Sequence, residues 1–268
     1  MIAAPKGPES RATAAAEAPV APKGRRTIPL RDVTLPHRCP KPLRLRVLGR
    51  APYFKTLSPQ QLEDVDARMQ TRVVPAGQPV YHSGQPAREL YVVAEGRVKL
   101  SQVTSDGTET LTDIHIPGEL FGAMGALGEP NHLQSAHALV DTCLLYIGQI
   151  DFRRVLEAHP KVALEVLDSV ALRLRQAHSD AGGQATSTVK QRVATALLRL
   201  AEKVGRPAEN GVLIDTPLSR ADLAGLARST PESVSRVMSA WKKEGVISSG
   251  RRWVALEDVG ALGRVAAG

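Results

Sequence analysis

The sequence contains very little cysteine, and this excludes several kinds of fold and site. Cys39 and Cys143 are the only two cysteines among 268 residues. Two cysteines are too few for a disulfide framework, and they stand too far apart for a zinc site. The sequence also lacks a nucleophile placed beside a base, a cluster of metal ligands and a glycine-rich phosphate loop before a helix. We therefore expect neither an enzyme nor a metal site.

Long hydrophobic runs are also missing. No apolar stretch approaches the ~18 residues that a membrane-spanning helix needs. The N-terminal segment AAAEAPVAPKGRRTIP lacks the apolar centre of a signal peptide. These absences predict a cytoplasmic protein with no membrane partner. Residues 1–42 carry many prolines and few large apolar side chains, which cannot offset the entropy cost of ordering, so we expect a disordered basic tail there.

Charge is distributed unevenly along the chain. The formal net charge is +8, from 35 Lys and Arg against 27 Asp and Glu. Residues 1–46 hold ten basic and three acidic side chains, residues 47–183 hold twelve and sixteen, and residues 184–268 hold thirteen and eight. Two basic ends favour a polyanionic partner, of which nucleic acid is the commonest. A solvated basic surface is the alternative.

Short β-branched runs cut by glycines occupy Thr71 to Gly148, as in ELYVVAEGRVKL. Asp106-Gly107 between two alternating runs predicts a hairpin. Closely spaced strands of this length indicate a small β-sandwich or barrel, and we assign it to a domain of residues 43–150. Ser58, with Pro59 and Gln61 after it, predicts the capped start of a helix before the first strand.

A long helix with two apolar faces is predicted to begin at Pro160. One row, Val162, Val166 and Val170, can pack on the β domain. The other row repeats at the three-and-four spacing of a coiled-coil seam, so we expect a parallel homodimer built on residues 151–181. Burial inside one larger domain is the alternative. The segment AGGQAT (181–186) predicts a break or hinge near Gly182. The residues expected to line the dimer contact are Leu164, Leu167, Val170, Ala171 and Leu174.

A pair of short capped helices is predicted within residues 182–268, after a helix from about Thr188 to Val204 and a loop. Ser219 with Asp222 forms the capping box of the first helix, which ends near Ala227, and Thr230 caps the second. Their short connection is typical of a helix-turn-helix. Val234, Met238 and Trp241 form the inward face of the second helix. The segment VISSGRRWVAL after it predicts a β-hairpin wing.

The outward face of this second helix carries groups that can read DNA bases. Arg236 can bind a guanine through two hydrogen bonds, and Glu232 can accept one from a cytosine. Each contact is worth roughly 1–3 kcal/mol of discrimination. We expect base contacts from Glu232, Ser235 and Arg236. We expect phosphate contacts, which set register without reading sequence, from Lys190, Arg192, Ser219, Arg220, Thr230, Ser233, Arg251 and Arg252.

Taken together, PAGQPVYHSGQPARELYVVAEGRVKL, PGELFG (117–122), the long helix and the winged helix resemble the cAMP receptor protein/FNR superfamily of bacterial transcription regulators, over about residues 45–258. The resemblance implies an α+β fold: a jelly-roll barrel of the cyclic-nucleotide-binding type, a long dimerisation helix and a C-terminal winged helix-turn-helix. Glu232, Ser235 and Arg236 look like the E-x-x-S-R pattern of the FNR branch. This implies an inverted repeat nearer TTGAT–ATCAA than TGTGA–TCACA.

The resemblance also places an effector pocket in the barrel, where the family pattern is altered. Its cAMP-binding members have a ribose-binding glutamate after GELFG and an arginine–serine pair for the phosphate. This chain has Ala123 and Gln134-Ser135 instead, so cAMP is not expected, because the bidentate hold on phosphate is missing. The expected pocket residues are Gly118, Glu119, Leu120, Phe121, Gly122, Ala123, Met124, Gly125, Gln134, Ser135 and His178.

The identity of the effector stays open when the other effectors of the family are considered. An oxygen-sensing iron–sulfur cluster needs about four thiolates, which two cysteines do not supply. Haem is an option, and so are a small acid, a nucleotide or no effector at all. The histidines available to a haem are His82, His115, His132, His137 and His178.

These observations predict an effector-responsive transcription regulator that binds an inverted-repeat operator as a homodimer, with RNA polymerase as its further partner. The sensor barrel would shift the pose of the winged helices through the seam around Leu167–His178 and the hinge near Gly182. The alternative is a ligand-binding module that acts on a protein partner and does not read DNA.

Overall fold

The computed structural model describes residues 39–104, 107–122, 130–184 and 187–268, all of which belong to one compact unit. Its first elements are α1 (Lys41–Arg50), the 3₁₀ turn η1 (Pro52–Phe54) and α2 (Pro59–Ala67). The predicted helix start is confirmed, because Ser58 Oγ accepts from the Gln61 amide and the Gln61 side chain accepts from the Ser58 amide.

A disulfide joins Cys39, directly before α1, to Cys143 in the β domain. The sequence did not predict this pairing, which joins residues 104 positions apart, because two cysteines are too few to indicate a disulfide framework.

In the described part of the β domain, eight strands form two separate four-stranded antiparallel sheets rather than one closed barrel. This arrangement confirms the predicted jelly-roll type. The hairpin of β4 (Val98–Val103) and β5 (Glu109–His115) turns through Gly107, which has a φ of +82°. The first sheet is ordered β1 (Gln70–Val74), β8 (Thr142–Gly148), β3 (Glu89–Glu95), β6 (Leu120–Phe121), and the second β2 (Pro79–Tyr81), β7 (Ser135–Ala138), β4 (Val98–Val103), β5 (Glu109–His115).

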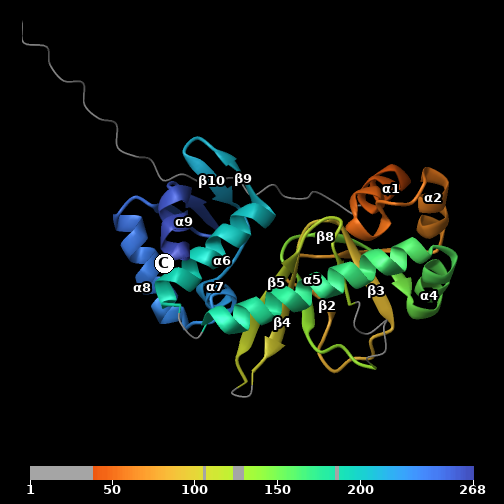
Figure 1. Ribbon diagram of the computed structural model, residues 1–268, viewed down its shortest axis with the longest axis horizontal. Helices are drawn as coiled ribbons and strands as arrows, with labels where there is room; N and C mark the ends of the chain where they lie inside the picture. Colours follow the sequence, from red (N-terminus) through yellow and green to blue (C-terminus); the bar gives the residue numbers. More distant parts are fainter. Residues whose placement is uncertain (1–38, 105–106, 123–129, 185–186) are drawn as a thin grey trace, which may run out of the picture. The chain divides into compact units, whose positions relative to one another are not determined.

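The helix α4 (Gln149–Ala158) leads into the long helix α5 (Pro160–Gln184) (Figure 1). Val162 and Val166 are buried in the same core as α1 and β8, whereas Leu164 and Leu167 are 62% and 64% exposed. The two predicted faces of α5 are therefore present. The helix α5 ends at Gln184, inside the segment AGGQAT for which a break was predicted, and the next helix begins at Val189, although Gly182 itself is still helical. Two glycines cost a helix interior about 1 kcal/mol each, which is too little to end an established helix.

The C-terminal region is a winged helix-turn-helix, as predicted. Its turn separates α7 (Arg220–Leu226) from α8 (Pro231–Lys243), and β11 (Ile247–Gly250) and β12 (Trp253–Leu256) form the wing. Val234, Met238 and Trp241 are at most 1% exposed, which confirms the inward face of α8. Its elements are α6 (Val189–Val204), β9 (Gly205–Ala208), β10 (Gly211–Ile214), α7 (Arg220–Leu226), α8 (Pro231–Lys243), β11 (Ile247–Gly250), β12 (Trp253–Leu256) and α9 (Val259–Ala267).

The loop predicted after Val204 is instead the hairpin β9–β10. The strand β10 pairs with β12, with Val212 opposite Leu256, so β9 and β10 extend the wing into a four-stranded sheet. Pairing with a strand more than 40 positions later overrides the local turn signals.

The edge strand β5 of the jelly roll packs on the winged helix. Leu111 and Ile114 belong to the same buried cluster as Leu197, Ala224 and Trp241. A Cβ atom on Gly225 would lie 2.8 Å from the Leu111 backbone, so the close approach of α7 requires glycine. Within the described ranges, no helix is long and apolar enough to cross a membrane.

Candidate DNA-binding surface and effector cavity

The start of α8 is built to present polar groups outward. Thr230 Oγ1 accepts from the Ser233 amide at 3.3 Å, and Pro231 fills the first helical position. Glu232 and Arg236 are exposed and Ser235 is half-buried, on the side opposite the buried row. The Glu232 amide and the Thr230 hydroxyl hold the pKa of Glu232 below its usual range, so this side chain is a carboxylate at neutral pH. Arg236 donates to Ser233 Oγ at 3.2 Å.

Six of the eight candidate phosphate contacts lie at helix caps, at the start of α6 or in the wing, where they are exposed or half-buried. Lys190, Arg251 and Arg252 are exposed, and the last two occupy the turn of the wing, where Arg252 has a φ of +71°. Ser219 and Thr230 are exposed cap residues, and Ser233 is half-buried between Thr230 and Arg236. The helix-turn-helix also contains exposed Lys and Arg residues that were not predicted, namely Arg228 in the turn and Lys242 and Lys243 at the end of α8.

Two of the predicted phosphate contacts, Arg192 and Arg220, make hydrogen bonds within the protein. Arg192 donates to the carbonyls of Ala227 and Ser187, at 3.0 and 2.6 Å, and so ties α6 to the turn. Arg220 donates to Met238 Sδ at 3.2 Å, and burial lowers its pKa. Arg228 in the turn has a φ of +45°, a conformation that usually selects glycine. No sequence signal points to an arginine there.

A cavity of about 480 Å³ lies between the jelly roll and α5. Of the predicted effector residues, Leu120, Phe121, Gly122 and Gln134 line it. Gly118 and Ser135 are not among the described lining residues, since the Gly118 amide donates to Val93 and Ser135 Oγ accepts from the Ser83 amide. Ala123, Met124 and Gly125 lie outside the described residues, as does the side chain of His178 on α5.

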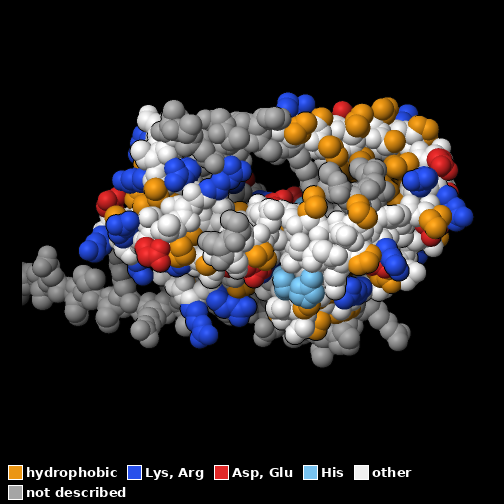
Figure 2. Space-filling model, turned by 90° about the horizontal axis from the view of Figure 1, so that it is seen from below, with side chains coloured by type: hydrophobic (Ala, Val, Ile, Leu, Met, Phe, Trp, Pro, Cys, Tyr) orange, Lys and Arg blue, Asp and Glu red, His pale blue; other side chains and the backbone are white. Residues whose placement is uncertain are grey.

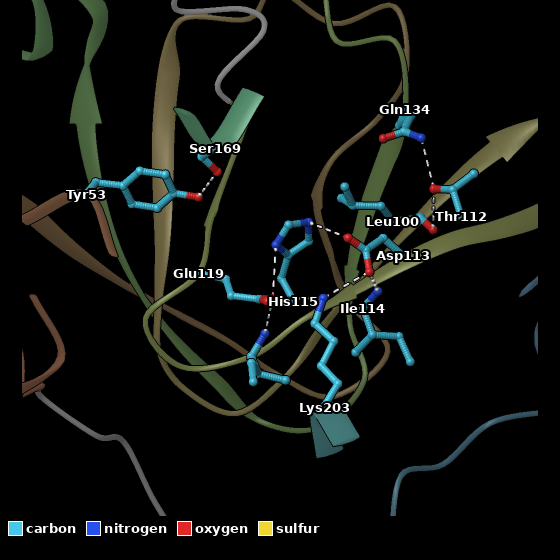
Figure 3. Close-up of polar contacts among 11 residues, drawn as sticks. Tyr53, Leu100, Thr112, Asp113, Ile114, His115, Glu119, Gln134, Ser169 and Lys203 are labelled. Atoms are coloured by element: carbon cyan, nitrogen blue, oxygen red, sulfur yellow. Dashed lines mark hydrogen bonds and ion pairs between the residues drawn. The ribbon is translucent and has the colours of Figure 1, made fainter. Parts of the chain in front are cut away.

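The cavity wall is apolar with neutral polar groups. Tyr81 stacks on His132 with ring centroids 3.6 Å apart, and burial lowers the pKa of His132. Ser169 of α5 lies 3.3 Å from the Tyr53 hydroxyl, and Gln134 donates to Thr112 at 2.9 Å (Figure 3). No Lys or Arg occurs among the described lining residues. The described wall therefore offers no cationic partner to a cyclic phosphate.

Glu119, predicted for the pocket, belongs instead to an ionic cluster beside Lys203 of α6. His115 is fully buried, with its ring nitrogens 3.6 Å from Asp113 and 3.4 Å from Glu119 (Figure 3). Lys203 Nζ lies 3.0 Å from both carboxylates. We name these four residues the junction cluster. It links β5 and the turn after it to the winged helix.

The two carboxyls of the junction cluster have opposite pKa shifts. Burial would raise the pKa of Asp113, but the His115 imidazole and the Lys203 ammonium bring it below its ordinary value. Burial raises the pKa of Glu119, and this exceeds the opposing effect of Lys203. Arg97–Asp215 at 3.2 Å and Lys99–Asp222 at 3.7 Å add further ion pairs between the same two regions.

Hydrophobic and basic side chains are distributed unevenly over the surface. In the face shown in Figure 2, hydrophobic side chains are denser on the right of the view, whereas Lys and Arg side chains are prominent on its left. The exposed leucines of α5 add an apolar row, Leu164, Leu167 and Leu174.

A jelly-roll domain with a cavity, joined through a long two-faced helix to a capped and winged helix-turn-helix, defines a DNA-binding protein of the ligand-responsive class. The model of the cyclic nucleotide-binding domain family matches residues 71–159, and that of the Crp-like helix-turn-helix domain matches residues 191–265.

Known proteins agree with this class. The cyclic AMP receptor protein of Thermus thermophilus is 32% identical over 218 residues, covering 81% of this chain and 98% of that protein. The structure of FixK2 from Bradyrhizobium japonicum is 25% identical, with a TM-score of 0.65 over 75% of this chain and 98% of that one. A CRP/FNR-family regulator from Thermus thermophilus is 26% identical, with a TM-score of 0.60 over 74% and 99%. The chain belongs to the CRP/FNR family of transcription regulators, whose members bind DNA.

Proposed function

We propose that this regulator acts as a homodimer on an inverted-repeat operator, and that a small molecule in the jelly-roll cavity controls how the two winged helices meet the DNA. The observation that carries the proposal is the division of α8 into a polar outward face and a buried apolar face. Glu232, Ser235 and Arg236 form its outward face, opposite the buried Val234, Met238 and Trp241. A helix of this kind reads base edges from its N-terminal turns, which is where these three side chains stand.

Dimerisation is supported by the exposed face of α5. Leu164, Leu167 and Leu174 repeat at coiled-coil spacing and are 58–64% exposed in the single chain, with Val170 and Ala171 beside them. A second copy packed in parallel would cover this row. Two copies of α8 related by a twofold axis would then address half-sites about one helical turn apart.

Effector control is supported by the position of the cavity on the same helix. Val166, Ser169 and Val170 of α5 line it, and Leu174 belongs both to the cavity wall and to the exposed row. A ligand there would bias α5 and, through the junction cluster, the pose of the winged helix. The described wall supports a ligand that is mostly apolar and lacks a phosphate.

In this proposal residues 43–150 sense the effector, residues 151–181 dimerise and residues 182–268 bind DNA. The regulator would work in the cytoplasm and act on transcription through RNA polymerase. We propose a half-site nearer TTGAT than TGTGA, because Glu232, Ser235 and Arg236 follow the FNR-type pattern.

The test substitutes one base-reading residue. Arg236→Ala should weaken binding to a TTGAT–ATCAA duplex by about 10- to 100-fold for each of the two half-sites, the value of one bidentate base contact per chain, and should relax specificity at one position of each half-site. Arg50→Ala, which removes an exposed arginine from α1, is the charge-matched control. Electrophoretic mobility shifts at fixed salt measure both variants. Equal binding by Arg236→Ala and the wild type would refute the assignment of α8.

A further inference from the structure

The only two cysteines of the sequence meet in the core of the sensor region. The disulfide connects Cys39 to Cys143, with Cα atoms 6.6 Å apart, a separation that suits such a bond. Each cysteine is 3% exposed, and both lie in one buried cluster with Val47, Leu48 and Val166. Disulfides in the cytosol are usually transient and redox-sensing, because glutathione and thioredoxin keep thiols reduced there.

We propose that Cys39 and Cys143 form a reversible redox couple, whose bond fixes the α1–η1 segment against α5 and the effector cavity. The inference rests on the proposed function, since it places the regulator in a reducing compartment beside DNA. The oxidant is a low-molecular-weight disulfide of the glutathione class.

The two cysteines differ in how they can move. Cys143 lies in β8, which is paired on both sides by β1 and β3, opposite Val73 and Glu95. Cys39 stands outside the sheets, directly before exposed Pro40 and Lys41. Loosening the start of α1 would therefore uncover the bond without opening a sheet, which gives the exchange reaction a route to both sulfurs.

The exchange balances with oxidised glutathione. One cysteine thiolate attacks a sulfur of glutathione disulfide, forming a mixed disulfide and releasing one glutathione thiolate. The second cysteine thiolate attacks the protein-side sulfur, forming the Cys39–Cys143 bond and releasing the second glutathione. The protein loses two electrons, which glutathione disulfide gains, and the two thiol protons end on the two glutathiones.

The bond acts on the regulatory region through a short path. Cys39 anchors the start of α1, and α1 continues through buried Ala51 into η1. Tyr53 of η1 lines the cavity and accepts from Ser169 of α5, and Lys55 pairs with Glu165 of α5 at 2.9 Å. Oxidation would therefore restrict the segment that touches both the cavity and the dimerisation helix.

The first experiment counts thiols in the full-length protein across glutathione buffers of increasing GSSG content, by alkylation and mass spectrometry. We expect two alkylated cysteines in reduced glutathione and none in oxidised glutathione, with reversal on transfer back. Two free thiols in every buffer would overturn the proposal. So would a bond that reduced glutathione does not open, because that bond would be a permanent cross-link.

The second experiment measures the consequence of the bond. Hydrogen exchange in residues 41–55 should be slower in the oxidised protein, and the operator dissociation constant should differ between the two forms by about fivefold or more, the low end of typical coupling between sites. Cys39→Ser and Cys143→Ser should both keep the value of the reduced wild type in either buffer, and the reduced wild type serves as their folding control. Equal dissociation constants for the two wild-type forms would overturn the regulatory role. Loss of operator binding in every form would instead count against the proposed function. In that case the thiol count would still show whether Cys39 and Cys143 form a reversible couple.

Discussion

Lys203 Nζ, on the first helix of the winged domain, lies 3.0 Å from Asp113 Oδ1, on the edge strand of the jelly roll. The same ammonium is 3.0 Å from Glu119, so one cation joins two carboxylates of the sensor region to the DNA-binding region. These ion pairs connect the jelly roll directly to the winged helix, in addition to the chain connection through α5.

Removing the shared cation should loosen this junction. Lys203→Ala would leave Asp113 and Glu119 without their common partner, at a cost of about 1–3 kcal/mol, the usual range for a partly buried charged group that loses its hydrogen bond. Urea unfolding at pH 7 measures the effect. Lys190→Ala, an exposed lysine on the same helix, is the control and should change stability by less than about 0.5 kcal/mol. Equal stabilities of the two variants would contradict the importance of the junction.

The pKa of Asp113 predicts a pH-dependent contribution to stability. Its folded pKa is depressed, so its contribution is present above the unfolded pKa near 4 and is lost as the pH falls through the folded value. Asp113→Asn should therefore be less stable than the wild type at pH 7, and the difference should shrink below about pH 4. A difference that stays constant from pH 7 to pH 3 would show that the carboxylate charge is not responsible.

Glu119 should behave in the opposite way. Burial raises its folded pKa, so ionisation of this side chain opposes folding above that pKa and the cost disappears as the pH falls below the unfolded value. Glu119→Gln should gain stability relative to the wild type at pH 7, and the gain should vanish near pH 4. Chemical unfolding of both proteins from pH 4 to pH 8 measures it. A variant less stable than the wild type at pH 7 would mean that Lys203 outweighs burial.

The exposed leucine row of α5 should be needed for dimerisation. Leu167→Glu places a charge in the proposed seam, so sedimentation should report the 28.7 kDa of one chain instead of twice that mass. Operator affinity should fall by about 100-fold or more with the loss of bivalent binding. Ile150→Glu, which alters a 71% exposed side chain on α4, should remain dimeric. If Leu167→Glu sediments like the wild type, α5 is not the dimer contact.

The wing arginines should contribute affinity without specificity. Arg251→Ala with Arg252→Ala should weaken binding to all duplexes alike and reduce the slope of log K against log salt by about two per half-site, roughly one per phosphate contact. Fluorescence anisotropy from about 50 to 200 mM KCl measures the slope on an operator and on a scrambled duplex. A loss confined to the operator would assign these arginines to base reading instead.

Local signals were enough to predict most elements of the fold. The capping boxes at Ser58 and Ser219 and the cap at Thr230 lie where the sequence placed them, and the buried row of α8 followed from its spacing. These features depend on residues three or four positions apart, so the sequence contains them directly.

The features that sequence reasoning missed depend on long-range contacts. The β9–β10 hairpin forms because β12 offers an edge, and the disulfide and the junction cluster join residues 104 and about 90 positions apart. Arg192 and Arg220 resemble phosphate contacts in the sequence, but tertiary packing directs them to a carbonyl and a thioether. Glu119 was assigned to the pocket from the PGELFG motif alone, whereas its side chain lies beside His115.

The central claim is that two chains bind one inverted repeat through α8. Sedimentation of the full-length protein with a duplex of about 30 base pairs carrying TTGAT–ATCAA measures this directly, because it gives the stoichiometry and, with a scrambled duplex, the specificity. We predict two chains per operator and at least 1,000-fold weaker binding to the scrambled sequence, the low end for specific DNA-binding proteins (about 10³ to 10⁷). One chain per duplex, or equal affinity for both sequences, would contradict it.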